Sequence, residues 1–547
     1  MTRKPKHTNS ETLVIIGAGA TAALGMPTTD KQTKILRDLS NASGDYSSTH
    51  KTLGEYFYKN DLDKVVRFLQ VLDNDKTYEI RDSDLQNAKF IYGEQDDSLL
   101  RKRIHELRQQ YDWNALKHVI KICPHNKNED NLIRDVFSII DKKLLSHQSL
   151  KELSVSRLQG ARNFLILLIN MLFSASWYKI TNGEEADNFA KYQKFFYNFA
   201  RLMQDEARRF YNKYPLDSRE FYLFTTSFVS FNFEMVFPWL LMKTHYNLNH
   251  RKPCIKDRPL KLWLDYGCEH RGRKSNADGN IISTLEFTEA VASRENEDAH
   301  IGSELNRCGK FYFAHGSSNW RECSNCGRMT FYNGDSKSRW EDYKSKELIS
   351  PFPIPLFKTK KLTTLTHNEQ QWRKELQYDA LECMHCGAQT LGFDAPMIMQ
   401  TMYKSTPTSF LEEIQRNVKV AIEKARHIVL LGYSLPIDDT IWQHAFAEGI
   451  RAREEGDEAY CSVVVGIDGE ERWLYKKEIA EYIQRNPNTA NTKTIQNARA
   501  IFGADKVRAW TGGIPQVFGA CGMDDVRELL YPDFVCWAGT RVNTNTT

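Results

Sequence analysis

The last third of the chain alternates short, continuously apolar segments with amphipathic helical patterns. The segments APMIM (395–399), HIVLLG (427–432) and CSVVVGID (461–468) are typical of strands, and 409–425 and 471–483 are typical of helices. A strand that is apolar at every position is buried on both faces, and such strands alternating with helices form a parallel sheet. The sequence therefore predicts an α/β fold: a Rossmann-like parallel sheet with helices on both faces.

The N-terminal part supplies the first strand of such a sheet. TLVII (12–16) leads directly into GAGATAALGMP (17–27), which is helix-like after Thr21. Glycines at a strand-to-helix turn let the backbone approach a phosphate, which the N-terminus of the helix can bind. The third glycine of the usual dinucleotide fingerprint is replaced by Ala22. A tight turn without a ligand is the alternative explanation.

The region between these parts has a different character. Apolar residues recur at helical spacing at Leu100, Ile104 and Leu107, and the apolar run 163–173 is too short to span a membrane. We expect a large helical insertion over 50–211. The Rossmann-like domain is then discontinuous, formed by 11–49, 212–302 and 395–540, after a disordered N-terminus at 1–10. Residues 303–394 are expected to hold a catalytic histidine segment and a small module with a long polar excursion at 335–380.

The cysteines indicate a metal site. The chain's 11 cysteines include two CxxC pairs, the number that a zinc ribbon needs, and each pair is followed directly by glycine. Paired thiolates at this spacing close a tetrahedral zinc site, and four protein ligands make it structural. The predicted ligands are Cys323, Cys326, Cys383 and Cys386. The alternatives are reduced cysteines without a metal, or His385 as a donor.

Charge and the N-terminal residues limit the function class. The 74 basic and 70 acidic residues of the 547-residue chain are nearly balanced, which argues against a dedicated nucleic-acid binder. Residues 1–10 are polar and basic, without the apolar segment of a secretory signal. We expect a cytoplasmic protein that does not insert into membranes.

Several short segments resemble, in order, the motifs of the sirtuins. They are GAGATAALGMP (17–27), SFNFE (230–234), AHGS (314–317), the two CxxC pairs, IVLLGYSLP (428–436) and VVVGID (463–468). The matches are short islands between Val14 and Asp468. The chain is similar to a divergent bacterial branch of this family, whose members hydrolyse NAD in anti-phage defence.

This resemblance implies roles for individual residues. Asn232 would position a water or a ribose hydroxyl, and His315 would act as general base. Taken alone, the histidine could be structural and the asparagine a helix cap. The residues implied in NAD binding are Gly17, Ala18, Gly19, Ala20 and Thr21 at the pyrophosphate, Pro27 and Thr28 at the nicotinamide, Gly432, Tyr433 and Ser434 at the ribose, and Asp468 at the adenosine ribose.

Departures from the family pattern favour one reaction. Deacylases of the family follow Gly-Ile-Pro with Asp-Phe-Arg, where this chain has Pro27-Thr28-Thr29-Asp30; the Asn-x-Asp motif is here Asn232-Phe233-Glu234. The helical insertion would crowd a channel for an acyl-lysine peptide. We therefore expect an NAD+ glycohydrolase that releases nicotinamide and ADP-ribose. An NAD-dependent protein deacylase and a non-catalytic NAD or ADP-ribose sensing or scaffold subunit are the alternatives.

The expected reaction leads to predictions about how the activity is controlled and whether NAD or NADP is the substrate. A hydrolase that depletes NAD would kill its own cell if always active, so we expect control by a homo-oligomer or by a partner defence protein such as a ring-forming ATPase. No basic cluster lies near the adenosine-ribose residues, which favours NAD over NADP, since a 2′-phosphate is usually bound by arginine.

Overall fold

The computed structural model describes the two ends of the chain more fully than its centre. The described residues are 11–211, 225–244, 260–265, 271–275, 281–286, 305–331, 381–382, 389–390, 397–399 and 409–537, with gaps at 43–45, 47–48, 58, 74–78, 94, 124–131, 182–185, 235, 242–243, 319, 324, 328, 437–438, 452, 455, 520–521 and 535–536. The predicted disordered terminus (1–10) and polar excursion (335–380) lie outside them.

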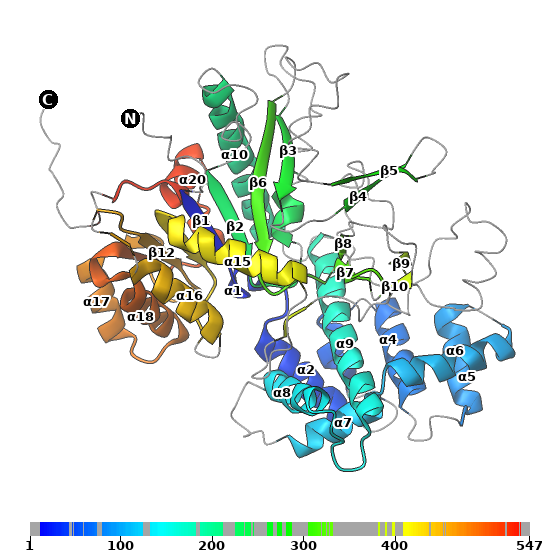
Figure 1. Ribbon diagram of the computed structural model, residues 1–547. Helices are drawn as coiled ribbons and strands as arrows, with labels where there is room; N and C mark the ends of the chain where they lie inside the picture. The colour runs from blue at the N-terminus through cyan, green and yellow to red at the C-terminus, as the bar shows by residue number, and fades with distance from the viewer. Residues whose placement is uncertain are drawn as a thin grey trace, which may run out of the picture.

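An eight-stranded sheet forms the centre of the fold (Figure 1). Its order is β13-β14-β12-β11-β1-β2-β6-β3, and β13 alone is antiparallel to its neighbour. The strands are β1 (Thr12–Ile16), β2 (Thr226–Ser230), β3 (Leu260–Asp265), β6 (Leu305–Phe313), β11 (His427–Leu431), β12 (Tyr460–Val464), β13 (Trp473–Leu474) and β14 (Val507–Trp510). The chain places β2, β3 and β6 on one side of β1, then β11, β12 and β14 on the other. This reversal is typical of doubly wound α/β sheets and opens a crevice at the carboxyl ends of β1 and β11.

The central strands are buried at every residue, as the apolar sequences of β1 and β11 predict. All residues of β1, β2 and β11 are buried. Phe199 of α10 (Ala186–Tyr211) contacts Phe228 of β2 on one face, at 5.3 Å between ring centroids. α15 (Ser409–Lys424) crosses the other face in front of the strands (Figure 1). The α/β prediction, with a mostly parallel sheet between helices, is confirmed.

The C-terminal half completes the helical layers. The remaining helices there are α16 (Thr440–Arg451), α17 (Lys476–Arg485), α18 (Ala490–Phe502), η4 (Ala504–Lys506), α19 (Ile514–Val517) and α20 (Met523–Leu530). The predicted helix over 471–483 instead begins with β13 and becomes α17 only at Lys476, because Trp473 and Leu474 pair with β14.

His427 at the start of β11 is enclosed between the sheet and α20. Its Nδ1 lies 3.1 Å from the Leu530 carbonyl oxygen and its Nε2 lies 2.8 Å from Ser462 Oγ. Because Nδ1–H must donate to the carbonyl, Nε2 accepts from the serine hydroxyl, which in turn accepts from Arg508 Nε at 2.8 Å. Burial, and secondarily the positive charge of Arg508, lower the pKa of His427 to about 3.

This histidine predicts acid sensitivity. An unfolded imidazole binds a proton near pH 6.5, whereas His427 in the folded protein stays neutral until about pH 3, so its contribution to stability is lost as the pH falls below about 6.5. We expect His427→Gln to destabilise the protein at pH 7.5, and the difference from wild type to shrink by about 2 kcal/mol at pH 5. Urea unfolding at both pH values measures this. A difference that is constant with pH would contradict a neutral buried histidine.

A second hydrophobic core, separate from that of the sheet, belongs to helices of the N-terminal part. They are α2 (Thr29–Asn41), α3 (His50–Gly54), α4 (Lys59–Leu72), α5 (Asp82–Tyr92), α6 (Asp97–Gln110), α7 (Trp113–Ile122), α8 (Leu132–Leu145) and α9 (Val155–Thr181). We call α2–α9 the helical unit. It begins earlier than residue 50, and α10 packs on the sheet rather than within it, because Tyr192, Phe196 and Phe199 belong to the sheet core.

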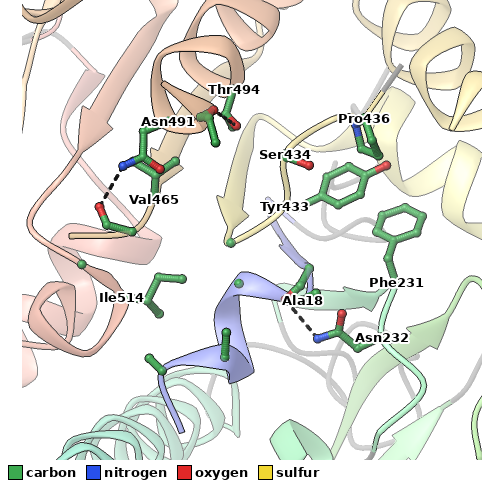
Figure 2. A pocket seen from close by; sticks show the side chains of 18 of the residues that line it. Ala18, Phe231, Asn232, Tyr433, Ser434, Pro436, Val465, Asn491, Thr494 and Ile514 are labelled. Carbon is green, nitrogen blue, oxygen red and sulfur yellow. Dashed lines mark hydrogen bonds between the residues drawn. The ribbon is translucent and has the colours of Figure 1, made fainter. Parts of the chain in front are cut away.

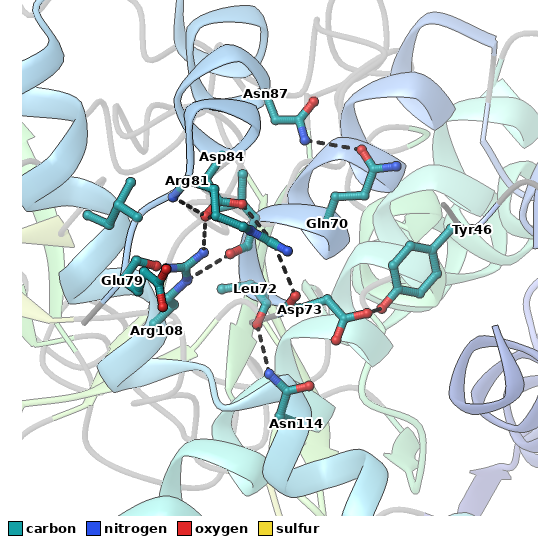
Figure 3. A network of polar contacts seen from close by, with 12 residues as sticks. Tyr46, Gln70, Leu72, Asp73, Glu79, Arg81, Asp84, Asn87, Arg108 and Asn114 are labelled. Carbon is teal, nitrogen blue, oxygen red and sulfur yellow. Dashed lines mark hydrogen bonds and ion pairs between the residues drawn. The ribbon is translucent and has the colours of Figure 1, made fainter. Parts of the chain in front are cut away.

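Buried charges join three helices of this unit (Figure 3). Arg108 of α6 donates to Asp84 of α5 at 2.7 Å and, through Nε, to the Val71 carbonyl of α4 at 2.8 Å. Arg81 also donates to Asp84. Burial acts to raise the pKa of Asp84, but the hydrogen bonds from Arg81 and Arg108 hold it below its ordinary value. The network fixes α4, α5 and α6 relative to one another.

Helix α9 is the most apolar element of the helical unit. Among the described residues it alone contains a window, Val155–Trp177, that is long and apolar enough to cross a membrane. Of that window, 72% is buried within the protein, as in the core helix of a soluble domain.

The central region adds two small sheets. One is four-stranded, in the order β5-β4-β8-β7, and the other pairs β9 with β10. Their strands are β4 (Arg271–Ser275), β5 (Ile281–Glu286), β7 (Trp320–Glu322), β8 (Met329–Phe331), β9 (Leu381–Glu382) and β10 (Gln389–Thr390). β6 belongs to the main sheet, so the module predicted over 303–394 begins only after His315. The predicted strand at 395–399 is wrong for residues 397–399, which are irregular; there the Ile398 N–H donates to the His315 carbonyl at 2.8 Å.

Candidate functional site

A cavity of about 760 Å³ lies at the carboxyl ends of six parallel strands (Figure 2). Its size is typical of pockets for small molecules and cofactors, and its place is the crevice created by the reversal of strand order. The segments that contribute to its walls are Gly17–Gly19 after β1, Phe231 and Asn232 after β2, His315 after β6, Gly432–Ser434 after β11, Val465–Ile467 after β12, and Gly513–Gln516 after β14.

The cavity unites most of the residues predicted from the sequence. Those that line it are Gly17, Ala18, Gly19, Asn232, His315, Gly432, Tyr433 and Ser434. They come from four strand ends that are far apart in the chain. Parallel strands end at the same edge of a sheet, so short motifs directly after strands converge there.

Five predicted binding residues are not among those that line the cavity. Ala20 and Thr21 are buried beneath the turn, and Ala20 accepts a hydrogen bond from Tyr192 through its carbonyl. Pro27 and Thr28 lead into α2, where their carbonyls bond to Gln32. The Asp468 carboxylate accepts from Tyr482 OH at 2.5 Å. The Asp468 carboxylate and the carbonyls of Ala20, Pro27 and Thr28 make these local bonds, and the NAD-binding roles of the five residues stay predictions.

Gly17 of the first turn and Gly432 of the β11 turn have no room for a Cβ where the two turns pack together. A Cβ on Gly17 would lie 2.5 Å from the Gly432 carbonyl oxygen, and a Cβ on Gly432 would lie 2.2 Å from the Ala20 nitrogen. Gly19 N–H donates to Gly432 O at 3.1 Å, and Gly432 N–H donates to Val464 O at 3.0 Å. Close contact between the two turns thus explains these glycines without any ligand.

The same bonds change the predicted phosphate cradle. Besides Gly19, the N–H groups of Ala20 and Thr21 donate to the carbonyls of Gly17 and Ala18. Helix α1 (Gly19–Ala22) is only four residues long. Gly17 N–H also donates, to the Leu431 carbonyl at 3.0 Å. Of the cradle predicted from 17–21, four N–H groups therefore bond to backbone carbonyls, while Gly17, Ala18 and Gly19 still line the cavity.

Asn232 lies at the start of the loop after β2 with its amide fixed. Its Nδ2 donates to the Gly17 carbonyl at 3.0 Å and to Glu234 Oε1 at 2.9 Å. Figure 2 shows the amide oxygen on the other side, toward Phe231 and the open part of the cavity. Asn232 can therefore accept a hydrogen bond from a molecule in the cavity.

Glu234 is the buried carboxyl group of this site. Its side chain is 8% exposed, and it bonds to Asn232 and Thr21. Burial raises its pKa to about 7, against the opposing effect of its hydrogen bonds. The sequence showed this residue only as a departure from a family motif, and it was not among the predicted site residues.

His315 is held between aromatic rings and a second carboxylate. Trp442 Nε1 donates to His315 Nε2 at 3.3 Å, so in the neutral ring the proton is on Nδ1. Asp439 Oδ2 lies 3.8 Å from the same Nε2 and accepts from Tyr433 OH at 2.9 Å. Phe231 packs edge-on against His315 at 5.0 Å. Sequence reasoning missed Asp439 and Trp442, although both follow closely on the predicted GYSLP segment.

The far end of the cavity is formed by residues that had no place in the predicted motifs. Asn491 of α18 donates to the Gly466 carbonyl at 3.1 Å, beside Thr494. Within the described part of the chain, Gln516 Oε1 is buried and has no hydrogen-bond partner. The two glycines before Ile514, directly after β14, were a signal that could have indicated this wall.

The first CxxC pair lies in the turn between β7 and β8. Gly327 N–H donates to the Cys323 carbonyl at 2.8 Å, and Gly327 has φ 67°. This is the tight turn predicted for a zinc knuckle, and it fits one half of a tetrahedral site. Cys383, Cys386 and His385 lie outside the described residues. Among the residues that are described, no three His, Cys, Asp or Glu side chains form a metal site.

Comparison with known proteins adds no relative. No protein-family model matches this sequence, and no match was found among the curated proteins searched. The resemblance to the sirtuins therefore rests on the short motifs and on the pocket that they form.

Proposed function

We propose that the protein is a sirtuin-like NAD+ glycohydrolase. The observation that supports this most is the meeting of Asn232 and His315 in one cavity with the Gly17–Gly19 turn, at the point where strand order reverses. These three motifs are some 213 and 83 positions apart in the chain, and the parallel sheet brings them to the edge where α/β folds bind their ligands. A cavity of about 760 Å³ suits a dinucleotide better than a free metal ion or a single water.

Cleavage of the nicotinamide–ribose bond needs few catalytic groups from the protein. The nicotinamide of NAD is already a cationic leaving group, so the site must orient the ribose and present a water. A water that donates to Asn232 Oδ1 attacks the ribose C1′, the C1′–N bond breaks, and nicotinamide leaves with the electron pair. The water loses a proton to His315, and ADP-ribose is the second product.

The state of His315 matters for this step. For Nδ1 to accept the proton of the water, the neutral ring must carry its own proton on Nε2. That N–H then faces Asp439, and the hydrogen bond from Trp442 to Nε2 is given up. Asp439 Oδ2 lies 3.8 Å from Nε2, on the side to which that N–H would point. Tyr433 holds Asp439 in place through its hydroxyl.

We further propose a cytoplasmic role in bacterial anti-phage defence by NAD depletion. Activity that destroys the NAD pool requires control, so assembly into a homo-oligomer or binding of a partner such as a ring-forming ATPase would switch it on. The helical unit and the segment after His315 are the proposed contact surfaces. Cys323, Cys326, Cys383 and Cys386 are proposed to hold a structural zinc.

Incubation of the purified protein with NAD, without peptide, tests the reaction. Nicotinamide and ADP-ribose are followed by chromatography over a series of protein concentrations. We expect both products in equal amounts, with a specific rate that rises with protein concentration. Nicotinamide released only when an acylated peptide is added would indicate a deacylase instead. NAD that binds in calorimetry but remains intact would indicate a sensing subunit.

A further inference from the structure

We propose that Glu234 is a positioning residue, which holds the Asn232 amide in the one orientation that turns Oδ1 into the cavity. This inference rests on the proposed function, in which that oxygen orients the attacking water. Glu234 itself is not among the residues that line the cavity. It therefore acts through Asn232 and not on the substrate.

The contacts of the amide nitrogen define its orientation. Asn232 Nδ2 faces oxygen atoms only: the Gly17 carbonyl at 3.0 Å, Glu234 Oε1 at 2.9 Å and Thr21 Oγ1 at 3.5 Å. An amide rotated by 180° would set its oxygen against the first two, both of which are acceptors. Buried acceptors without a donor are unfavourable, so the observed orientation is strongly preferred.

Glu234 supplies a second close acceptor for the Asn232 amide, which the turn after β1 does not provide. The Gly17 carbonyl satisfies one of the two amide N–H groups, and Thr21 Oγ1 is at the limit of hydrogen-bond distance. The second N–H depends on the Glu234 carboxyl. The backbone of Asn232 is held independently of Glu234, because Asn232 N–H donates to Ser230 Oγ at 3.1 Å. Without Glu234 the side-chain amide would lose one of its two close acceptors while its backbone remained in place.

The protonation state of Glu234 leaves this role intact. Burial raises the pKa of the carboxyl to about 7, so both forms are present near neutral pH. In the acid form the proton resides on one oxygen, and the other still accepts from Nδ2. The relevant property is therefore an acceptor atom at this position rather than a charge.

Two uncharged variants of Glu234 test whether its acceptor oxygen is the property that Asn232 requires. Glu234→Gln keeps an acceptor oxygen at the same distance along the side chain, and Glu234→Met has similar length without it. We expect the Met variant to lower kcat for nicotinamide release by about 10- to 100-fold with little change in KM, and the Gln variant to stay within about threefold of wild type. Equal activity of the two variants would overturn the proposal. If the Met variant does not fold, Glu234→Leu takes its place.

A second measurement does not need turnover. In protein labelled with ¹⁵N at asparagine side chains, the Asn232 amide signals are identified by their loss in Asn232→Asp. We expect two separate, slowly exchanging N–H signals in wild type and in Glu234→Gln, and averaged or fast-exchanging signals in Glu234→Met. Unchanged signals in the Met variant would also overturn the proposal. Because these signals are read without NAD, they stand even if the protein proves not to cleave NAD.

Discussion

Asn232→Ala is expected to stop NAD cleavage while the cavity still binds ADP-ribose. In the proposed reaction the amide oxygen orients the attacking water, and removal of one such oriented group lowers kcat by about 10²- to 10³-fold. The substitution also removes two buried hydrogen bonds, to the Gly17 carbonyl and to Glu234, each of which contributes about 0.5–1.5 kcal/mol of stability. Nicotinamide release under saturating NAD, with ADP-ribose affinity by calorimetry, measures both properties.

Asn491→Ala is the matched control in the same cavity. Its amide also donates to a backbone carbonyl, that of Gly466, but at the opposite end of the cavity (Figure 2). We expect this variant to weaken ADP-ribose binding and to leave kcat almost unchanged. A similar loss of kcat in the two variants would contradict a specific role for Asn232, and so would full activity of Asn232→Ala.

Gly432→Ala is expected to destabilise the whole protein. The added Cβ would lie 2.2 Å from the Ala20 nitrogen and 2.5 Å from the Gly19 carbonyl carbon, and both atoms are backbone. Backbone cannot move aside as a flexible side chain can, so the β1 and β11 turns must separate. Their hydrogen bond between Gly19 and Gly432 would then break. We expect a loss of more than about 4 kcal/mol in the free energy of unfolding, measured with urea.

Gly503→Ala distinguishes this clash from backbone strain. Gly503 has φ +90° and Gly432 has φ +62°, so both substitutions strain the backbone, but a Cβ on Gly503 would meet no atom within 4 Å. The strain alone costs about 1–2 kcal/mol. If Gly432→Ala were no more harmful than Gly503→Ala, the close packing of the two turns would not be what requires the glycine.

These variants show how sequence and structure divide the site. Asn232 and His315 could be named from the sequence because each follows a strand directly, and the ends of parallel strands lie together. Glu234 and Asp439 could not be assigned to the site in that way. Their importance comes from contacts with Asn232 and with His315, and contacts between side chains on different elements leave no periodic signal in a sequence.

The glycines also show what the sequence alone leaves undecided. GxG after an apolar strand predicted a tight turn and, by chemistry, a phosphate contact. The turn is present, but Gly17 and Gly19 also pack against Gly432, more than 400 positions away in the printed sequence. One residue type meets both requirements, so its presence alone does not separate them.

The boundaries of the helical unit depended on packing as well. Helical spacing predicted the helices themselves, but not which core each would join. Helix α2 packs within the helical unit and α10 on the sheet, because the apolar face of each meets a different partner.

By itself, the sequence determined the α/β class, the buried central strands and the edge of the sheet where the motifs meet, because burial on both faces requires continuous apolar strands. Tertiary structure alone decided which turn atoms face the cavity, how the Asn232 amide is oriented and which carboxyl groups accompany the two central residues. These depend on distances of about 3 Å between segments far apart in the chain, which folding sets and local sequence does not encode.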